Sequence, residues 1–362
     1  PVNGAGIITA HDEFVVDENR KSLETRFLRF KSTKTDEELL HQLFQVRRKK
    51  GWSILEANIA FKKLTELEIK DRILPFLYRP FETKFIIYDE NVVWSRSFPT
   101  MKHMVKENLG LIVPKQFKEE PGAFVSKSLA GHKTVSAYDV NTIFPLYLYK
   151  SEESKKRAGI QSIMLFEPAA TYGSERVANI SKSVFEKLKT VYSKKIEPEH
   201  VFYYCYAILY SKIYRDRYSE FLKIDFPRIP FTVDYKLFQL LFMIGETLSG
   251  IHLNPEKQKS IVKYLGDGES LVEKPIFNKK ENRVYTNPTK YFDGISVGMW
   301  EYQIGGYQIL KQYLESRKGE RLDFFQHYCH VATAINQTIL LQEKIDDLYK
   351  ELEIETIEFK KS

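Results

Sequence analysis

Residue types that bind metals or attack substrates are sparse in this chain. His327 and His330 lie on either side of Cys329, but no cluster of carboxylates or cysteines joins them. A zinc site needs three or four ligands at matched spacing, so we interpret the two histidines as residues of a helix face. The sequence contains no Gly-x-Gly-x-x-Gly, Gly-x-x-x-x-Gly-Lys-Ser/Thr or His-Glu-x-x-His unit. Nothing therefore predicts a dinucleotide, nucleoside triphosphate or catalytic zinc site.

The segment Asn287-Pro288-Thr289-Lys290-Tyr291 partly matches the Asn/Asp-Pro-Pro-Tyr/Phe turn of adenine methyltransferases. In that turn the aromatic residue directly follows the second proline and stacks on the flipped base. Here Thr289 and Lys290 occupy those two positions, so the backbone would place Tyr291 differently. We interpret this segment as a turn without a catalytic role.

The strongest chemical signal is basic residues interleaved with aromatic residues in three segments. These segments run from Tyr78 to Lys84, from Tyr204 to Pro230 and from Trp300 to Arg321. Lys and Arg bind phosphates and aromatic rings stack on bases, so this composition is compatible with nucleic-acid binding. The candidate DNA contacts are Arg79, Lys84, Arg215, Arg217, Lys223, Arg228, Lys311, Arg317, Lys318 and Arg321.

The second segment also has a structural interpretation, a buried tyrosine-rich helix with internal ion pairs. Two steps along a helix turn by roughly 200°, so Arg215 and Arg217 face different sides. We expect one of them to pair inside the fold. The candidate partners are Asp216, Glu220 and Asp225.

Two further features leave a similar choice open. Gly305-Gly306 permits close approach of either another backbone segment or a phosphate. The run Arg47-Arg48-Lys49-Lys50 ends at Gly51 and is typical of a solvated turn, with phosphate contact as the alternative.

Composition predicts a globular protein with a mild preference for anionic partners. The 362 residues include 55 Lys and Arg and 48 Asp and Glu, giving a net charge of +7. The two cysteines, Cys205 and Cys329, exclude a disulfide framework and suit a reducing cytoplasm. The longest apolar stretch, around Tyr235 to Ile251, is interrupted by charged residues, so we expect no membrane span. Aromatic residues at 14% fit either a broad polar contact surface or a thick core.

The hydrophobic periodicity predicts an α+β fold, with a mixed, β-containing first half and a helix-rich second half. Segments with helical spacing are Thr35 to Leu67, Ser181 to Lys195, Glu199 to Tyr218 and the residues after Asp234. Apolar residues at steps of three and four, from Leu341 to Leu352, predict a long amphipathic helix at the end.

Two local patterns predict a hairpin and a boundary. Phe85–Tyr88 and Asn91–Trp94 flank Asp89-Glu90, which predicts a β-hairpin. The charged stretch from Lys150 to Gly159 is the best place for an internal boundary, giving possible sub-lobes 1–150 and 151–362.

Together, the three basic and aromatic segments resemble the carboxy-terminal region of type ISP restriction–modification enzymes. Further matching stretches are Gly6 to Phe14, Phe144 to Tyr149 and Leu248 to Leu253, in order along nearly the whole chain. Those enzymes are long polypeptides that join a nuclease, a helicase-like ATPase, an adenine-specific methyltransferase and a target-recognition domain. The chain departs from the pattern at Lys84, where Arg is usual, and at His11, where a basic residue is usual.

The resemblance implies that residues 1–362, which begin at Pro1, are the target-recognition region of a longer restriction–modification enzyme used in phage defence. It implies sequence-specific recognition of duplex DNA for an adenine-specific methyltransferase domain upstream in the same polypeptide. S-adenosylmethionine would bind in that domain, and we expect no cofactor, metal or catalytic residue in this region. Two alternatives stay open: an interaction scaffold that docks other domains, and an independent enzyme with an unrecognised site. A continuous positive groove would favour DNA recognition, and an exposed apolar patch would favour the scaffold.

Overall fold

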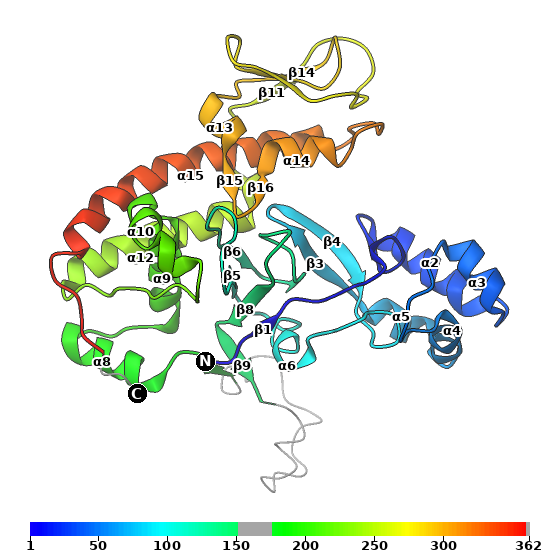
Figure 1. Ribbon diagram of the computed structural model, residues 1–362, viewed down its shortest axis with the longest axis horizontal. Helices are drawn as coiled ribbons and strands as arrows, with labels where there is room; N and C mark the ends of the chain where they lie inside the picture. The colour runs from blue at the N-terminus through cyan, green and yellow to red at the C-terminus, as the bar shows by residue number, and fades with distance from the viewer. Residues whose placement is uncertain (151–175, 360–362) are drawn as a thin grey trace, which may run out of the picture.

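The structure, a computed structural model, describes residues 1–150 and 176–359. A small helical lobe lies at one end of the molecule, β-sheets form its centre, and a larger group of helices forms the other end (Figure 1). The predicted α+β class is confirmed, as are the mixed first half and the helix-rich second half.

The N-terminal helical lobe is built around a cluster of phenylalanines. The rings of Phe14, Phe27, Phe30 and Phe61 are buried, with centroids of neighbouring rings 4.9 to 5.8 Å apart. Such edge and tilted contacts are the arrangements that aromatic pairs prefer. The helices of this lobe are α1 (Asp12–Val15), α2 (Arg20–Ser32), α3 (Glu37–Phe44), α4 (Ile54–Lys62) and α5 (Glu66–Asp71). The helical spacing between residues 35 and 67 is thus confirmed by α3 and α4.

Two four-stranded sheets form the centre of the molecule. In one sheet the strand order is β1-β8-β5-β6, and in the other it is β2-β4-β3-β7, where β7 runs parallel to β3. The strands of the first sheet are β1 (Gly4–Ala5), β5 (Gly110–Pro114), β6 (Phe124–Ser126) and β8 (Asn141–Pro145). Those of the second sheet are β2 (Val16–Asp17), β3 (Ile73–Arg79), β4 (Glu82–Ile87) and β7 (Leu129–Ala130), and the short helix α6 (Phe98–Met101) follows β4.

The hairpin predicted around Asp89-Glu90 is wrong. Strand β4 pairs with the preceding strand β3, and the hairpin turn lies at Pro80-Phe81, where Phe81 has a left-handed φ of 64°. Asp89 instead stabilises a turn, because its Oδ1 accepts a hydrogen bond from the backbone N–H of Asn91 at 2.9 Å. An aspartate that bonds to the backbone two residues later is as typical of an isolated turn as of a hairpin loop.

Helices dominate the second half of the chain. They are α8 (Lys182–Tyr192), α9 (Pro198–Tyr210), α10 (Lys212–Arg217), α11 (Ser219–Leu222), α12 (Tyr235–Leu253), α13 (Val297–Glu301), α14 (Ile309–Glu315) and α15 (Phe325–Leu352), with the 3-10 helix η2 (Pro255–Lys257). The predicted long C-terminal helix is confirmed as α15. Asp234 caps α12 by accepting a hydrogen bond from the N–H of Lys236 at 2.7 Å. In the part of the chain that the structure describes, no helix has the length and apolarity needed to cross a membrane.

A small antiparallel sheet projects from the body above α15 (Figure 1). Its strands, in spatial order, are β11 (Lys263–Leu265), β14 (Tyr291–Asp293), β13 (Arg283–Tyr285) and β12 (Ile276–Asn278). One face packs on the helices, with Phe292 against Tyr328 at 4.1 Å and Phe277 against Trp300 at 5.4 Å between ring centroids. Two strand pairs complete the fold: β9 (Tyr147–Tyr149) with β10 (Arg176–Ala178), and β15 (Gln303–Ile304) with β16 (Tyr307–Gln308).

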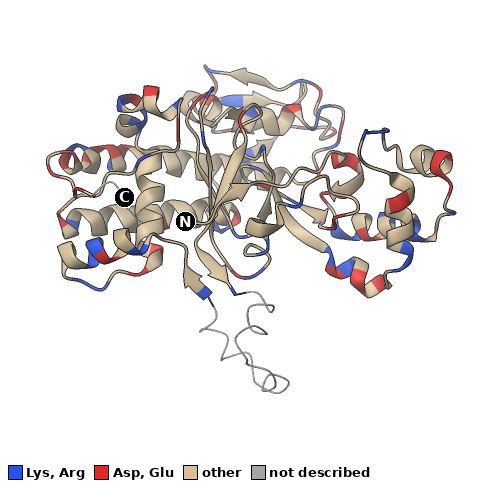
Figure 2. Ribbon diagram, turned by 60° about the horizontal axis from the view of Figure 1, so that its bottom comes forward, with Lys and Arg blue, Asp and Glu red and all other residues tan. Residues whose placement is uncertain are grey.

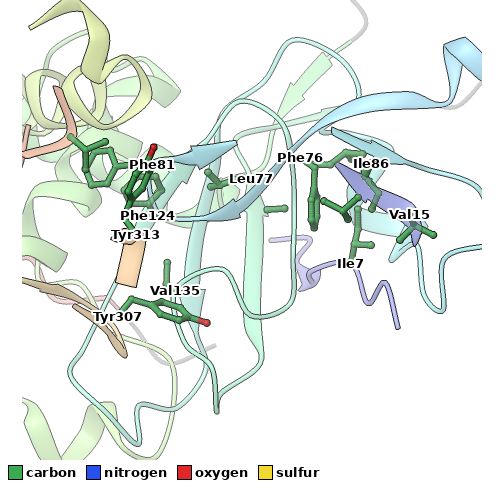
Figure 3. Close-up of a cluster of buried hydrophobic side chains, with 14 of the residues drawn as sticks. Ile7, Val15, Phe76, Leu77, Phe81, Ile86, Phe124, Val135, Tyr307 and Tyr313 are labelled. Atoms are coloured by element: carbon green, nitrogen blue, oxygen red, sulfur yellow. The ribbon is translucent and has the colours of Figure 1, made fainter. Parts of the chain in front are cut away.

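The buried hydrophobic side chains form two clusters, and each draws on residues from both halves of the chain. Figure 3 shows Val135 beside Tyr307, and Phe81 and Phe124 beside Tyr313, within the first cluster. The sub-lobes 1–150 and 151–362, which stay a prediction, would therefore share their cores. The predicted boundary at 150–159 lies, apart from Lys150, outside the described residues.

Helix α12 offers a matched pair of glycines for testing the packing. A Cβ atom at Gly245 would collide with the carbonyl oxygen of Tyr203 in α9, whereas one at Gly250 would meet no atom within 4 Å. We expect Gly245→Ala to lower the free energy of unfolding by about 1–3 kcal/mol through overpacking. Gly250→Ala should raise it by about 0.5–1 kcal/mol because alanine favours the helix. Urea unfolding of both variants measures this, and equal effects would contradict the close α9–α12 contact.

Candidate nucleic-acid interface

Two of the three basic and aromatic segments meet in the structure. The guanidinium of Arg79, at the end of β3, lies 4.4 Å from the ring centroid of Tyr78 and 4.9 Å from that of Tyr307. Its Nη1 donates hydrogen bonds to the carbonyl oxygens of Tyr78 at 3.0 Å and Lys133 at 3.1 Å. The Tyr307 hydroxyl donates to the same Lys133 oxygen at 3.0 Å. Arg79 is therefore held between two segments, those of Tyr78 and Tyr307, which are more than 200 residues apart in sequence.

At Gly305-Gly306 the backbone of the third segment comes close to the backbone at Val135. Gly305 has a φ of 58°, and a Cβ atom there would collide with the carbonyl oxygen of Val135. The backbone N–H of Gly306 donates to that same oxygen at 3.2 Å. Of the two interpretations left open by the sequence, the structure therefore supports contact with another backbone segment at this point.

An ion network lies beside Arg79. Nη2 of Arg317 is 2.9 Å from carboxylate oxygens of both Glu18 and Glu82, and Nζ of Lys84 is 3.4 Å from Glu18 and 3.9 Å from Glu82. The Arg317 side chain is only 13% exposed, and its guanidinium lies 3.8 Å from the ring centroid of Tyr313. Burial raises the pKa of Tyr313 to about 12, so the phenol stays neutral. Arg317 and Lys84 thus neutralise glutamates of this chain.

A groove of about 820 Å³ opens over this network. It is lined by β3, β4, β6 and the residues around the α14–α15 connection. Its charged lining consists of Glu18, Glu82, Glu256, Glu320 and Asp323 against Lys84, Lys127, Arg317 and Arg321. Five carboxylates against four cations give no excess of positive charge. The lining as a whole therefore gives a phosphate group no net electrostatic attraction.

Three candidate residues on α14 and the connection to α15 are exposed, and one of them, Arg321, lines this groove. Lys311 lies on α14, and Lys318 and Arg321 lie on the connection to α15. Within residues 1–150 and 176–359, none of these three side chains forms an ion pair. Their charges are therefore available to a ligand, in contrast to that of Arg317.

The tyrosine-rich segment folds differently from the continuous helix that its spacing predicted. The chain breaks between α9 and α10 at Ser211, whose hydroxyl caps α10 by accepting from the N–H of Tyr214 at 3.1 Å. Arg215 reaches back across this break, and its Nε donates to the carbonyl oxygen of Leu209 at 2.6 Å. A cation is favourable at the C-terminus of a helix, where carbonyl groups lack partners.

The ion pair of this segment differs from the predicted internal pair, because it lies at the surface, where the Arg217 side chain is 54% exposed. Arg217 pairs with Glu353, beyond the end of α15, and not with Asp216, Glu220 or Asp225. Of the remaining candidates, Lys223 pairs with Glu220 at 2.7 Å on the surface. Arg228 is exposed, and its carbonyl oxygen accepts from the Tyr214 hydroxyl at 3.1 Å.

His252 is a buried polar residue that is absent from the candidate site residues predicted from the sequence. It lies within Leu248 to Leu253, one of the stretches that resemble the type ISP enzymes. Its Nδ1 is 2.7 Å from the Tyr206 hydroxyl, and its Nε2 is 2.9 Å from Oγ1 of Thr338. Because the Thr338 hydroxyl donates to the carbonyl of Ala334, we assign Nε2 as the donor and Nδ1 as the acceptor. Burial lowers the pKa of His252 to about 3, so the imidazole is neutral at physiological pH.

The two histidines and the Asn287 segment noted in the sequence make hydrogen bonds to backbone groups within the fold. His327 Nε2 is 2.9 Å from the carbonyl oxygen of Phe81, and His330 Nδ1 is 3.0 Å from that of Gln258. Oδ1 of Asn287 accepts from the N–H groups of Thr289 and Lys290, as in an Asx turn. The described residues contain no group of three or more His, Cys, Asp or Glu that could hold a metal ion.

Charge is distributed broadly over the molecule. Figure 2 shows Lys and Arg interspersed with Asp and Glu on the helices at both ends of the molecule, with fewer charged residues on the central strands. The ten candidate residues fall into two groups, one around β3–β4 and α14, the other on α10, α11 and the residues after them. Lys84 and Arg317 meet through Glu18 and Glu82, whereas Arg215 and Arg217 have separate partners, Leu209 and Glu353. Neither group therefore forms a single basic cluster.

The family model described as the Type ISP C-terminal specificity domain matches residues 1–346, and the chain therefore belongs to this family. The resemblance to the carboxy-terminal region of type ISP enzymes, inferred from the sequence, is thereby confirmed.

Solved structures with a similar fold include a cryo-EM structure of a DrdV–DNA complex, at 18% identity and a TM-score of 0.71, covering 95% of this chain and 35% of that chain. A nuclease-deletion mutant of the Type ISP restriction–modification enzyme LlaGI with a DNA substrate mimic matches at 18% identity and a TM-score of 0.65, covering 95% of this chain and 27% of that chain. The ATP-dependent Type ISP enzyme LlaBIII bound to DNA matches at 18% identity and a TM-score of 0.67, covering 95% and 23%. The chain thus spans between 23% and 35% of the length of these solved chains. None of the curated protein sequences matches it significantly.

The ion network predicts that two adjacent cations, Arg317 and Lys318, contribute very differently to the free energy of unfolding. Arg317→Met would leave Glu82, whose side chain is 15% exposed, with only the more distant Lys84. We expect this variant to lose up to about 3 kcal/mol of unfolding free energy, because removal of one partner leaves a largely buried charge. Lys318→Met, the exposed control, should change stability by less than about 0.5 kcal/mol. Chemical denaturation distinguishes them, and equal stability of the two variants would refute a stabilising role for Arg317.

Burial of His252 predicts that the free energy of unfolding decreases at acidic pH. Its folded-state pKa of about 3 lies below the ordinary value of 6.5, so between these values the unfolded state binds more protons. The unfolding free energy should therefore fall as pH decreases from 6.5, by up to about 1.4 kcal/mol per pH unit from this group. We expect His252→Gln to flatten this dependence. Thr338→Val, which removes a hydrogen bond but keeps the imidazole, should retain it; a His252→Gln profile parallel to the parent would contradict this account.

Proposed function

We propose that this chain recognises a specific duplex DNA sequence on behalf of an adenine-specific DNA methyltransferase in the same polypeptide. The observation that carries the proposal is membership of the Type ISP specificity family over residues 1–346. The similarity of fold to Type ISP enzymes whose structures contain DNA supports it. The chain would act as the part of a restriction–modification enzyme that selects the DNA site, in the cytoplasm and in defence against phage.

The phosphate contacts would come from the exposed candidate cations, and we assign this role first to Lys311, Lys318 and Arg321. Their freedom from ion pairs among the described residues supports the assignment. Lys and Arg on phosphates would supply register and much of the affinity. Arg, Gln or Asn side chains beside them would contact base edges in the major groove, where the four base pairs are distinguishable.

The other candidate residues already contact groups of this chain, which limits how they could contact DNA. Lys223, Arg217 and Arg228 would contact DNA only by leaving or sharing their present surface contacts. Arg79 and Lys84 would present their remaining N–H groups at the edge of the groove. Arg317 and Arg215 would hold neighbouring segments in position, because each is engaged with other groups of this chain.

The methyl transfer would take place outside this chain. The upstream domain would bind S-adenosylmethionine, flip the target adenine and methylate its exocyclic amine. This chain would contribute by holding duplex DNA in a fixed register against that domain.

A second candidate function, docking of other domains of the parent enzyme, is favoured by one apolar groove. It has a volume of about 410 Å³ and is lined between Tyr214 and Pro230 mostly by apolar and aromatic side chains. Phe221 is 67% exposed and Ile224 is 65% exposed in this region. Large exposed apolar side chains that cluster are typical of protein contact sites. Both roles can coexist, since this groove lies apart from the exposed cations around α14.

The DNA-recognition proposal predicts salt-dependent binding by the whole chain. With about five phosphate contacts, the logarithm of the binding constant should fall with the logarithm of salt concentration at a slope near −4.5. Lys318→Ala combined with Arg321→Ala should reduce the magnitude of this slope by about 1.8. Titration of a mixed-sequence duplex at several salt concentrations measures both quantities.

The matched control carries Lys182→Ala and Lys187→Ala, two exposed lysines of α8. It should bind DNA with the parent slope and an unchanged melting temperature. Absence of DNA binding by the parent chain would favour the docking function, and an unchanged slope in the Lys318/Arg321 variant would place the DNA contacts elsewhere.

A further inference from the structure

The turn between α3 and α4 carries four consecutive exposed cations, Arg47 to Lys50. Arg48 pairs with Glu38. Among the described residues, Arg47, Lys49 and Lys50 form no ion pair. Like charges this close repel one another, and the repulsion is relieved when an anion binds.

This turn is held in a fixed shape. The N–H of Trp52 donates to the carbonyl oxygen of Lys49 at 3.2 Å, and the indole Nε1 of Trp52 donates to that of Asn91 at 2.7 Å. On the other side of the run, Val46 is buried, and its carbonyl oxygen is 2.6 Å from Nδ1 of His41. Cations on a fixed backbone lose less conformational entropy on binding than those of a mobile loop.

An exposed indole lies next to the cations. Trp94 is 45% exposed, and Nζ of Lys49 is 5.2 Å from the centroid of its ring. A Cβ atom at Gly51, which has a φ of 86°, would touch the same ring at 3.4 Å. The cation–π contact orients Lys49 but leaves its charge at the surface.

The turn adjoins the β3–β4 group of candidate residues. The rings of Trp52 and His11 lie 4.6 Å apart. Asp12, the next residue, accepts a hydrogen bond from the Tyr78 hydroxyl at 2.9 Å. The ring of Tyr78 in turn lies 4.4 Å from the guanidinium of Arg79. A short series of direct contacts therefore links the turn to Arg79.

We propose that Arg47, Lys49 and Lys50 contact the phosphate backbone of duplex DNA, as an extension of the surface that includes Arg79. The inference rests on the proposed DNA recognition and adds the N-terminal helical lobe to the DNA-binding surface. These three side chains are exposed and form no ion pair among the described residues, so their charges can neutralise phosphates of a DNA strand. Contacts of this kind add affinity and register without distinguishing bases.

The test compares two pairs of substitutions in the full chain, with a short mixed-sequence duplex as the probe. Arg47→Ala with Lys50→Ala should reduce the magnitude of the log–log salt slope by about 1.8, because each lost phosphate contact removes about 0.9. The loss of affinity should be the same for duplexes of different sequence. The control pair, Lys62→Ala with Lys63→Ala, removes two exposed lysines at the end of α4 in the same lobe and should keep the parent slope. Both variants should keep the parent melting temperature.

The outcomes separate this inference from the function on which it rests. If the parent chain binds no DNA, the proposed function fails and the inference fails with it. If the parent binds and the Arg47/Lys50 variant keeps its slope, the inference alone is overturned. An equal loss in the control pair would attribute the effect to the overall charge of the lobe and also overturn it. A loss confined to one DNA sequence would show base contact and contradict the assigned phosphate contact.

Discussion

The organisation of the candidate interface depends on how two arginines join distant segments. Arg79 lies between the rings of Tyr78 and Tyr307, and Arg317 lies between the carboxylates of Glu18 and Glu82. Together they fix the β3–β4 hairpin against the segment that leads through α14. A guanidinium suits both positions, because it stacks on aromatic rings and offers several N–H donors in one plane. The contact between these two segments therefore fixes the positions of the exposed Lys318 and Arg321, which follow α14, relative to β3 and β4.

The helix-rich half solves a different problem, the burial of many tyrosines. Tyr204, Tyr206, Tyr210 and Tyr214 in α9 and α10 are buried. Their hydroxyls reach partners: that of Tyr204 donates to the carbonyl of Pro230 and that of Tyr210 to the carbonyl of Ala123, each at 2.8 Å. Buried hydroxyl groups that find acceptors avoid the desolvation penalty and connect helices to loops and sheets. In this segment the abundant tyrosines therefore form a core in which buried hydroxyl groups are hydrogen-bonded. Composition alone had left open a core or a polar contact surface.

The sequence predicted the elements whose signals are local. Helical periodicity identified α3, α4, α8, α12 and α15, and in the structure the side chains of Asp36 and Asp234 cap the beginnings of α3 and α12. The hairpin was misplaced because its turn contains Phe81 in a left-handed conformation, which a bulky residue rarely adopts and which no propensity rule suggests. Helix α2 was missed as well.

The candidate residues were selected by type, and type alone does not reveal partners. Arg317 and Lys318 are adjacent in sequence, yet Arg317 is enclosed by Tyr313 and two glutamates whereas Lys318 is exposed. Glu353 could not be assigned to Arg217 because 136 residues separate them. Such pairings follow from tertiary packing, as does the burial of His252 against Phe124 at 5.2 Å between ring centroids. The family resemblance, in contrast, depended on ordered segments along the chain and was accessible from the sequence.

Selection of a specific DNA sequence by this chain can be measured by repeated enrichment of duplexes from a random-sequence pool with the full chain, followed by sequencing of the bound fraction. We expect enrichment of one defined sequence, and substitution of a single base pair within it should cost about 1–3 kcal/mol of binding free energy. A bound pool without an enriched sequence would exclude sequence selection and leave non-specific binding or domain docking as the role of this chain.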